Sequence, residues 1–387
     1  MVFHVLYIMV LRFVFAVCIL VSSSAFAQEL KTKNVIIITL DGFRWQEIFQ
    51  GADSAILFNK EYVKDNQTVD LFWNTSSLKR RENLLPFFWN VIGVEGQLYG
   101  NRNYKNQVNC ANPHWFSYPG YSELLVGFVD KRIKSNNAFE NPNTTILDFV
   151  NQQPGFENKV AAFATWEVMS SIAREETNHI PVNAGKDKAE GNISEREELL
   201  NELQDELPNP HGARYDAFTF QYALEYLKRE RSRFLFISFD ETDEHGHGGR
   251  YDAYLKSAHR TDGMIGELWT WIQSQEDYKD QTTIIITTDH GRGNGSKNSW
   301  KSHGRLSFGS SQMWFAILGP DTPALGEIKT EAQYFQKQIA KTAASLLDLD
   351  YTNVEPVGET INSMISSSVL ANQKTLVEKI IVGQQEK

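Results

Sequence analysis

The stretch T-I-I-I-T-T-D-H-G, residues 283–291, decides the fold, because a short apolar run ends abruptly in two polar side chains and a glycine. The stretch V-I-I-I-T-L-D-G, residues 35–42, repeats this pattern, and R-F-L-F-I-S-F-D-E-T-D-E-H-G-H, residues 233–247, carries a third version. Continuous apolar runs of this length are typical of strands buried on both faces of a parallel sheet. Since open parallel sheets collect ligands at the carboxyl ends of their strands, we expect the three polar clusters to meet at one edge.

Strand-like and helix-like segments alternate from residue 34 onward. This alternation predicts an α/β fold with a mostly parallel central sheet and helices on both faces. The predicted strands are Val35–Leu40, Val160–Phe163, Phe234–Phe239, Thr283–Thr288 and Met313–Leu318. The predicted helices are Asp216–Arg229, Ala253–Gln275, Ala332–Leu347 and the acidic segment Glu195–Glu206.

The chain of 387 residues is expected to form one elaborated domain over residues 28–382, because its length is compatible with one large core. Two stretches, residues 52–115 and 176–212, look like insertions on this scaffold. They are candidates for a cap over a substrate, with plain surface decoration as the alternative. Residues 383–387 are polar and are expected to fray.

Residues 1–27 differ from the rest of the chain. They hold an apolar run at residues 13–21 and an A-x-A cleavage site at residues 25–27, which predict a secretory signal peptide and a secreted, periplasmic protein. Met9 offers an alternative start to Met1. The apolar run is shorter than the roughly 20 residues that a transmembrane helix needs, so we expect no stable membrane span.

The balance of charges is acidic, with 38 Lys and Arg against 48 Asp and Glu and a formal net charge of −10. Proteins that bind nucleic-acid duplexes gather Lys and Arg on one face, so duplex binding is not expected. Cys18 lies in the expected signal peptide, which leaves Cys110 without a disulfide partner and excludes zinc sites made of four cysteines. The sequence does not define the oligomeric state.

Carboxylates and imidazoles near the three strand ends predict a divalent metal centre. Such ligands suit Zn²⁺, and an Asp-rich half of the site also suits Mn²⁺ or Mg²⁺. The candidate ligands are Asp41, Asp243, His247, Asp289, His290 and His303. A single Asp at a strand end more often caps a helix than binds a metal, so the prediction depends on all six together.

Spacing distinguishes between the candidate ligands around Asp243. His247 lies four residues further on and faces the same way in a helical turn, whereas His245, two residues further on, points elsewhere. Asp289 and His290 are adjacent and reach one ion only in an irregular turn, which the glycines that follow permit.

Ser117 is the candidate nucleophile, in the stretch F-S-Y-P-G-Y-S-E-L-L-V-G at residues 116–127. A loop that opens a short helix would set this serine near amide N–H groups and a positive helix end, which favour an anionic substrate. A serine hydroxyl is a weak nucleophile, and metal coordination would activate it. A capping role is the alternative, and these arguments do not separate Ser117 from Ser122.

The chain resembles the alkaline phosphatase superfamily, and within it the type I phosphodiesterase/nucleotide pyrophosphatase branch, over most of residues 34–320. That branch carries a strand ending in L-D-G, found here at residues 40–42. Its nucleophile motif, [T/S]-F-P-N-H-x-S-x-x-T-G, is matched by residues 117–127 at the nucleophile, the proline and the closing glycine. Its E-P-D-x-x-G-H corresponds to residues 241–247, and its D-H-G to residues 289–291.

The resemblance selects Ser117 over Ser122 and divides the ligands between two divalent ions, most simply Zn²⁺. The ligands implied for one ion are Asp243, His247 and His303. Those implied for the other are Asp41, Asp289 and His290, with the Ser117 hydroxyl beside them. Two such ions clamp the attacking and leaving oxygens of an in-line displacement. The resemblance therefore implies a phosphoric ester hydrolase that forms a phosphoserine intermediate.

Some residues depart from the branch pattern. Gly120-Tyr121 replaces the usual Asn-His, and serine replaces the commoner threonine, so the preference between monoesters and diesters stays open. The branch holds a phosphoryl oxygen with an asparagine near the nucleophile, for which Asn137 is our prediction and Asn136 the alternative.

Taken together, these features predict a secreted metal-dependent phosphatase or phosphodiesterase acting on a small-molecule, saccharide or nucleotide phosphoester. A sulfate or phosphonate ester hydrolase is the first alternative, although residues 117–121 lack the arginine of the sulfatase motif C/S-x-P-x-R. A non-catalytic ligand-binding protein on the same fold is the second.

Overall fold

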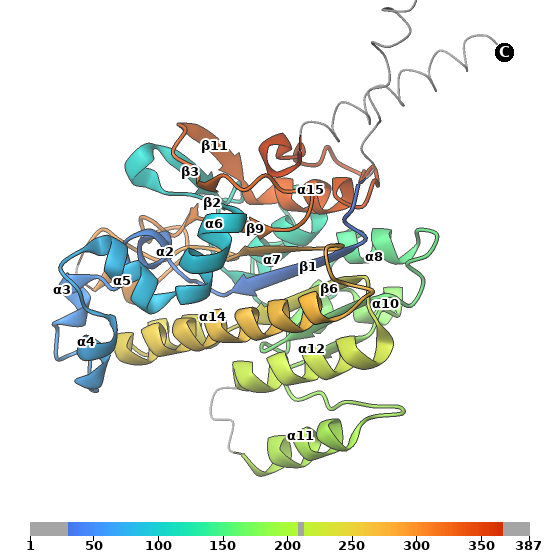
Figure 1. The fold of residues 1–387 in the computed structure, drawn as a ribbon, viewed down its shortest axis with the longest axis horizontal. Helices are drawn as coiled ribbons and strands as arrows, with labels where there is room; N and C mark the ends of the chain where they lie inside the picture. Colours follow the sequence, from blue (N-terminus) through green and yellow to red (C-terminus); the bar gives the residue numbers. More distant parts are fainter. Residues whose placement is uncertain (1–29, 208–212, 297, 367–387) are drawn as a thin grey trace, which may run out of the picture. The chain divides into compact units, whose positions relative to one another are not determined.

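The computed structural model describes residues 30–207, 213–296 and 298–366. A large, mostly parallel sheet lies between two layers of helices, which confirms the predicted α/β fold class (Figure 1). The expected signal peptide, residues 1–27, and the polar tail, residues 383–387, lie outside the described residues. Within the described part of the chain, no helix is long and apolar enough to cross a membrane.

The central sheet has eight strands in the order β10-β2-β9-β7-β1-β6-β4-β5. Strand β1 pairs in parallel with β6 on one side and β7 on the other, and every residue of these three strands is buried. The three apolar runs of the sequence are therefore neighbours in the sheet. The strands are β1 (Asn34–Leu40), β2 (Gln97–Tyr99), β3 (Asn106–Asn109), β4 (Val160–Ala164), β5 (Val182–Ala184), β6 (Phe234–Phe239), β7 (Thr282–Thr287), β8 (Gln312–Met313), β9 (Phe315–Leu318), β10 (Gly326–Glu327) and β11 (Ala332–Phe335).

The predicted strand Met313–Leu318 is divided between two sheets. Strand β8 pairs with β3 in a separate three-stranded sheet, whereas β9 joins the central sheet antiparallel to β7. Trp314 separates them, is fully buried, and donates its indole N–H to the Phe43 carbonyl oxygen at 2.8 Å. The apolar pattern runs on through Trp314 although the hydrogen-bonding partner of the backbone changes there.

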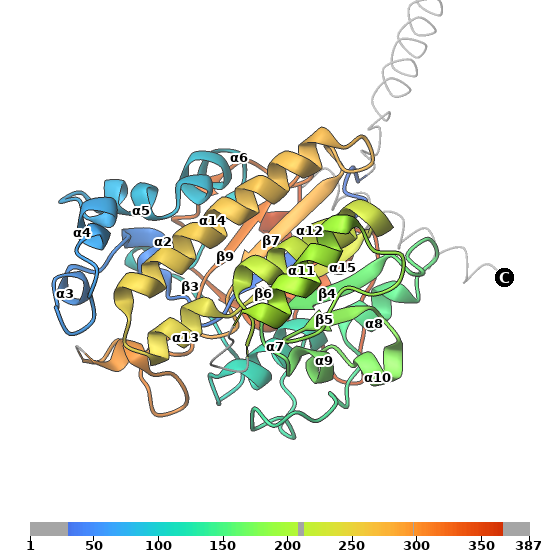
Figure 2. The same ribbon diagram turned by 90° about the horizontal axis from the view of Figure 1, so that it is seen from below.

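Helices cover both faces of the central sheet (Figures 1 and 2). The long helices α12 and α14 lie along one face, and α7, α8 and α15 lie across the other. The helices of eight or more residues are α5 (Ser77–Leu84), α7 (Ser117–Val126), α11 (Glu195–Glu206), α12 (Asp216–Glu230) and α14 (Tyr251–Ser274). The shorter ones include α2 (Trp45–Gln50), α3 (Ser54–Leu57), α4 (Gln67–Phe72), α6 (Gly93–Glu95), α8 (Ile146–Asn151), α9 (Met169–Ile172), α10 (Glu175–Asn178), α13 (Glu241–His247) and α15 (Ile339–Ser345).

The predicted helix Ala332–Leu347 is wrong in its first part. Ala332–Phe335 forms β11, which pairs in parallel with β3, and helix α15 begins only at Ile339. The helical spacing of apolar residues in this segment is a weak local signal, and the backbone pairing with β3 overrides it.

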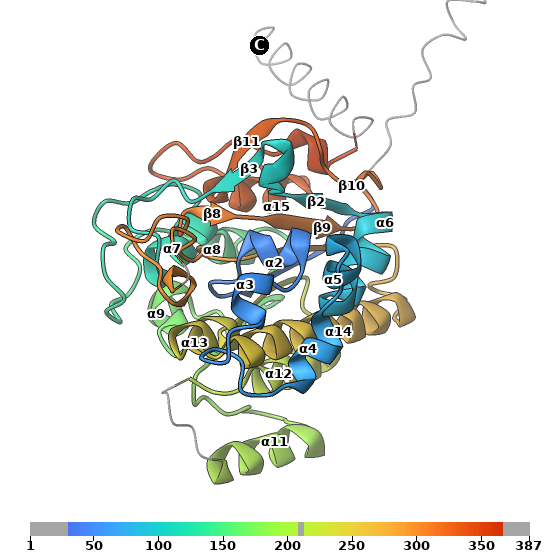
Figure 3. The same ribbon diagram turned by 90° about the vertical axis from the view of Figure 1, so that its left-hand side faces the viewer.

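Residues 52–115 form short helices that lie beside α14 (Figure 3), and they also supply strand β2 to the central sheet. Two carboxylates of α14 anchor this segment. Asp252 accepts the backbone N–H of Lys64 at 2.9 Å, and Asp262 accepts that of Phe87 at 2.8 Å. The segment is therefore fixed to the main body by buried side chains.

Helix α11 has the predicted bounds, Glu195–Glu206. Ser194 and Glu197 form a capping box, in which each side chain accepts the backbone N–H of the other residue. This reciprocal cap accounts for a well-defined start in a segment with few buried apolar residues.

Candidate metal centre

Three neighbouring strand ends supply the polar side chains of the site. Asp41 directly follows β1, Asp289 lies just beyond the end of β7, and Asp243 lies in α13, which follows β6. The Asp41 N–H donates to the Phe239 carbonyl oxygen at 2.8 Å, so the pairing of β1 with β6 continues up to this candidate ligand. The structure thus brings the three clusters to one edge of the sheet.

Asp41, Asp289 and His290, here called the inner triad, each place a ligand atom within 4.8 Å of the others. His290 Nε2 lies 3.3 Å from Asp41 Oδ1 and 3.4 Å from Asp289 Oδ2. These three atoms are buried and have no hydrogen-bond partner among the described residues. Buried polar atoms are nearly always satisfied, so three unsatisfied ligand atoms that converge fit a divalent cation.

The remaining carboxylate oxygens of the inner triad are held by the protein. Asp289 Oδ1 accepts the Gly42 backbone N–H at 3.1 Å, and Asp41 Oδ2 accepts the Tyr121 hydroxyl at 3.0 Å. Each aspartate therefore has one oxygen fixed by a hydrogen bond and one left for an ion. Supporting contacts of this kind orient metal ligands.

Burial sets the protonation of the inner triad in the metal-free protein. Desolvation, with the nearby charge of Asp289, raises the pKa of Asp41 well above its usual range. Burial also raises the pKa of Asp289 to about 8 and lowers that of His290 well below its usual value. His290 Nδ1 lies 2.8 Å from the Gly291 carbonyl oxygen, which favours the tautomer that leaves Nε2 free as a ligand.

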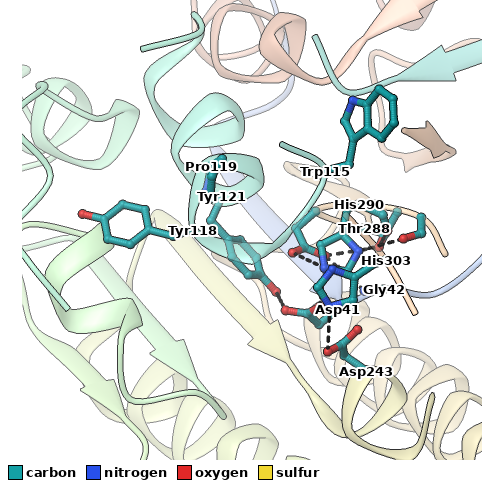
Figure 4. A network of polar contacts seen from close by, with 12 residues as sticks. Asp41, Gly42, Trp115, Tyr118, Pro119, Tyr121, Asp243, Thr288, His290 and His303 are labelled. Carbon is teal, nitrogen blue, oxygen red and sulfur yellow. Dashed lines mark hydrogen bonds and ion pairs between the residues drawn. The ribbon is translucent and has the colours of Figure 1, made fainter. Parts of the chain in front are cut away.

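Asp243, His247 and His303, here called the outer triad, lie beside the inner triad, and Asp243 and His303 also form a candidate ligand group with His290. Asp243 Oδ2 lies 3.0 Å from His247 Nε2 and 3.7 Å from His303 Nε2, and the two Nε2 atoms are 2.8 Å apart. His247 is 50% exposed, so this cluster faces the solvent. Figure 4 shows His303 beside His290, with the rings stacked at 4.0 Å, so the two triads share a border.

Arg292 is a fully buried cation that touches the outer triad. Its guanidinium forms an ion pair with Asp243 Oδ1 and donates to the carbonyl oxygens of Trp300 and Lys301, both at 2.6 Å. Burial by itself would raise the pKa of Asp243, but Arg292 and then His303 hold it well below its usual value. A Cβ atom at Gly246 would lie 2.5 Å from the guanidinium carbon, so the glycine makes room for the arginine.

Ser117 is the first residue of α7 and is buried. Gly120 and Tyr121 lie on the same helical face one turn later. Gly120 packs on the Asp289 carbonyl oxygen, where a Cβ atom would clash, and Tyr121 bonds Asp41. Gly120 and Tyr121, where the sequence departs from the family motif, therefore make close contacts with two ligands of the inner triad.

The other candidates near the nucleophile lie differently. Ser122 Oγ accepts the Asn141 side-chain amide at 3.1 Å, within the core. Asn136 Oδ1 accepts the Tyr118 backbone N–H at 2.9 Å and so reaches the start of α7. Asn136 and Asn137 are both exposed, and the Asn137 backbone N–H lies 3.4 Å from Ser135 Oγ. His245 lies 4.0 Å from Glu241, away from the outer triad.

Sequence analysis did not identify Arg292 or the role of Tyr121. Arg292 contacts Asp243 across 49 residues, and no local pattern indicates such a pair. The only signal for Tyr121 was its place in the helix after Ser117. In the sequence, a tyrosine that packs in the core cannot be distinguished from one that also supports a metal ligand.

Comparison with known proteins gives one family match and several similar folds. The profile of the family described as type I phosphodiesterase / nucleotide pyrophosphatase matches residues 58–306. No curated protein matches the chain at a significant level. The matched span covers more than half of the chain. It includes the segment of Ser117, the segments of the outer triad and Asp289.

Three solved structures illustrate the similarity of fold. Wild-type alkaline phosphatase PafA superposes with a TM-score of 0.59 at 11% identity, covering 88% of this chain and 100% of that one. Murine ectonucleotide pyrophosphatase/phosphodiesterase 5 gives 0.55 at 13% identity, covering 86% and 100%. A putative sulfatase from Bacteroides thetaiotaomicron gives 0.57 at 11% identity, covering 86% and 74%.

Proposed function

The chain belongs to the type I phosphodiesterase/nucleotide pyrophosphatase family of the alkaline phosphatase superfamily and is an enzyme that hydrolyses phosphoric esters, and from this premise we propose its mechanism. It is a secreted phosphatase or phosphodiesterase in which Ser117 is the nucleophile beside two divalent ions. Its substrate is a small-molecule, saccharide or nucleotide phosphoester.

The observation that carries the proposal is the contact between the inner triad and the first turn of α7. Three buried ligand atoms without hydrogen-bond partners converge there. The helix that begins with Ser117 packs directly on Asp289 and bonds Asp41. A serine in this place is next to a concentrated positive charge once an ion is bound, which is the condition for its activation.

Divalent ions held by the two triads would lower the pKa of the Ser117 hydroxyl and balance the negative charge of the phosphoryl oxygens. The imidazole-rich outer triad suits Zn²⁺, and the carboxylate-rich inner triad suits Zn²⁺, Mn²⁺ or Mg²⁺. The inner ligands are Asp41, Asp289 and His290, and the outer ligands are Asp243, His247 and His303.

The reaction has two displacements at phosphorus. The Ser117 hydroxyl gives its proton to water and its oxygen attacks phosphorus. The serine–phosphorus ester bond forms as the bond to the leaving oxygen breaks, and the departing alkoxide takes that proton back from the solvent. Water then attacks the phosphoserine, which restores the serine hydroxyl and releases the phosphoryl product. Asn136 supports these steps, because its Oδ1 is occupied by Tyr118 and its Nδ2 donors remain for a phosphoryl oxygen. Asn137 stays a prediction for the same task.

A sulfate ester hydrolase is the second candidate, because the fold similarity to a putative sulfatase is close to that to alkaline phosphatase PafA. A serine nucleophile and two ions accommodate a tetrahedral sulfate group by the same geometry.

The test is hydrolysis of an aryl phosphate, a diaryl phosphate and an aryl sulfate by the metal-loaded chain and by its EDTA-treated form. We expect metal-dependent turnover of a phosphate ester and a phosphoserine that can be trapped by acid quenching and located by mass spectrometry. Ser117→Ala should abolish both, and the matched control Ser122→Ala should retain both. Turnover of sulfate alone, or a phosphoserine at residue 122, would contradict the proposal.

A further inference from the structure

The loop that follows His303 exposes two large apolar side chains. Leu306 is 100% exposed and Phe308 is 74% exposed. With Val354, which is 81% exposed, they are the most exposed large apolar side chains in the described ranges of the chain. Such residues are ordinary when they are scattered singly, whereas two in one short loop indicate a surface that another molecule covers.

Hydrogen bonds tie this loop to the body of the protein. The Asn294 backbone N–H donates to the Phe308 carbonyl oxygen at 2.8 Å. Ser307, between the two apolar residues, directs its hydroxyl back onto the chain and donates to the Ser302 carbonyl oxygen at 3.2 Å. The exposure of Leu306 and Phe308 is therefore a fixed feature of a loop that makes its own internal contacts.

Two cations lie beside the apolar pair. Arg305 precedes Leu306, and a Cβ atom at Gly304 would lie 3.8 Å from the His114 carbonyl oxygen, so this loop passes next to His114. Burial, and then the charges of Arg305 and Lys134, lower the pKa of His114, which places both cations near one imidazole. Both are exposed, and neither forms an ion pair with another of the residues that the structure describes.

The cations and the apolar pair share one side of the molecule. The loop of residues 302–308, drawn in orange, and the loop after α7, drawn in blue-green, lie together at the lower edge of Figure 2 and at the left of Figure 3. The whole chain has a formal net charge of −10, so these unpaired cations are a local exception. An anionic surface attracts this side and repels the rest, which sets the orientation of the bound protein.

We propose that Leu306 and Phe308, flanked by Arg305 and Lys134, dock the protein reversibly on the surface of a membrane that contains anionic lipids. Apolar side chains flanked by cations bind in this way, because the former enter the boundary between headgroups and acyl chains and the latter face the lipid phosphates. A stable protein interface buries about 800 Å² on each partner, far more than two side chains supply, whereas a bilayer takes up single apolar side chains. This inference goes beyond the proposed function.

The test is sedimentation of the full chain with vesicles of phosphatidylglycerol and with vesicles of phosphatidylcholine. We expect binding to phosphatidylglycerol to be about ten times tighter and to weaken as salt is added. Leu306→Ser and Arg305→Glu should each weaken it about tenfold.

The matched controls change similar side chains elsewhere. Val354→Ser removes an exposed apolar group beside Asn353, whose side chain bonds the Val126 carbonyl oxygen at the end of α7 farthest from Ser117. Lys279→Glu reverses an exposed charge just before the start of β7, at the opposite end of that strand from Asp289. Both variants should bind as the wild-type chain does.

A label on the loop locates the contact. Leu306→Cys, coupled to an environment-sensitive fluorophore, should shift its emission to the blue on phosphatidylglycerol vesicles, whereas Val354→Cys should not. Cys110 is buried, and the unsubstituted chain gives the background from the native cysteines. Every variant carries the same residues 1–29 and 367–387, so a difference between variants reports the substituted position.

The proposal is overturned if the wild-type chain does not prefer phosphatidylglycerol, or if Leu306→Ser and Arg305→Glu bind as tightly as their controls. It is also overturned if the wild-type chain ignores both vesicles and Leu306→Ser abolishes self-association in sedimentation velocity, which would make this face a contact between copies. No arm depends on turnover, so docking and the proposed function can fail separately.

Discussion

The inner and outer triads have similar ligands but opposite surroundings. The inner triad is fully buried, carries two carboxylates, and has no salt bridge to Lys or Arg within the described residues. The outer triad carries one carboxylate, which Arg292 already neutralises, and one of its histidines is half-exposed. Once its two carboxylates are ionised, the inner triad offers an ion a site of charge −2, whereas the outer triad beside it has a charge near zero.

On the proposed two-ion centre, this difference implies separate tasks and separate affinities for the two ions. A buried pair of ionised carboxylates without a counter-ion is unfavourable until a cation arrives, so an inner ion would contribute to stability as well as to catalysis. The outer ion depends on two imidazoles and on geometry held by Arg292, and water can reach it. We expect the inner ion to be retained and the outer ion to exchange.

The largest effect is expected from removing one inner ligand. Asp289→Ala should abolish binding of the inner ion and lower kcat/KM by about three orders of magnitude, equal to about 4 kcal/mol of transition-state stabilisation. His247→Ala, the matched change in the outer triad, should lower it by about one to two orders, because water can replace an exposed ligand. Metal analysis and steady-state kinetics measure the effects of both variants. Equal losses of kcat/KM in the two variants would contradict the proposed difference between the triads.

Arg292→Met should have the next largest effect. It leaves Asp243 buried without its counter-ion and frees two carbonyl oxygens near His303, so the unfolding free energy should fall by about 3 to 5 kcal/mol. Denaturant unfolding of the metal-free protein measures this. Arg292→Lys keeps the charge without the fork of donors and should recover part of the loss. Complete recovery would mean that charge alone, and not the position of the donors, supports the outer triad.

The metal-free protein should become less stable as the pH rises from about 4 to about 8. The folded-state pKa of Asp289 is raised to about 8, so its contribution to stability is complete below the unfolded value and is lost as the pH rises through the folded value. One such proton changes the unfolding free energy by about 1.4 kcal/mol per pH unit in this range. Thermal unfolding with EDTA and with added Zn²⁺ checks this. The increase in unfolding temperature on adding Zn²⁺ should grow with pH. An increase that is the same at every pH would contradict the charge assigned to the inner triad.

Tyr121→Phe should have the smallest effect. It removes only the hydroxyl, which donates to Asp41 Oδ2 and accepts from Ser238 Oγ. This should lower the affinity for the inner ion about tenfold, as loss of supporting contacts of metal ligands commonly does. Competition with a chelator measures this affinity. Tyr118→Phe removes a hydroxyl bonded only to the Phe139 carbonyl oxygen and serves as the control. An equally large loss of metal affinity in Tyr118→Phe would show that both substitutions act through a general disturbance of α7.

The parallel part of the fold could be predicted because its signal is local. Each of the strands β1, β6 and β7 has a continuous apolar run followed by a polar cluster, and parallel pairing then brings the ends together without further information. The sheet change at Trp314 and the strand Ala332–Phe335 could not be predicted, because the partner β3 lies more than 200 residues away. Apolar spacing records burial and does not record the pairing partner.

The candidate ligands were predictable for the same reason, and their surroundings were not. Asp289 and Asp243 are each part of a short motif, whereas Arg292, Tyr121 and Asn136 act through contacts with residues distant in the sequence.

The inner triad also has a consequence for the folding of the chain. Asp41 and Asp289 follow two neighbouring strands that are distant in the sequence. The hydrogen bond from the Gly42 backbone N–H to Asp289, for example, joins residues that are 247 positions apart. Contacts of such high sequence separation form late, since their loop closure is slow. The ligands for the inner ion therefore assemble only when nearly the whole chain has found its topology. Uptake of an ion at this proposed site would therefore report completed folding, and the chain would become an enzyme at the same stage as it becomes stable.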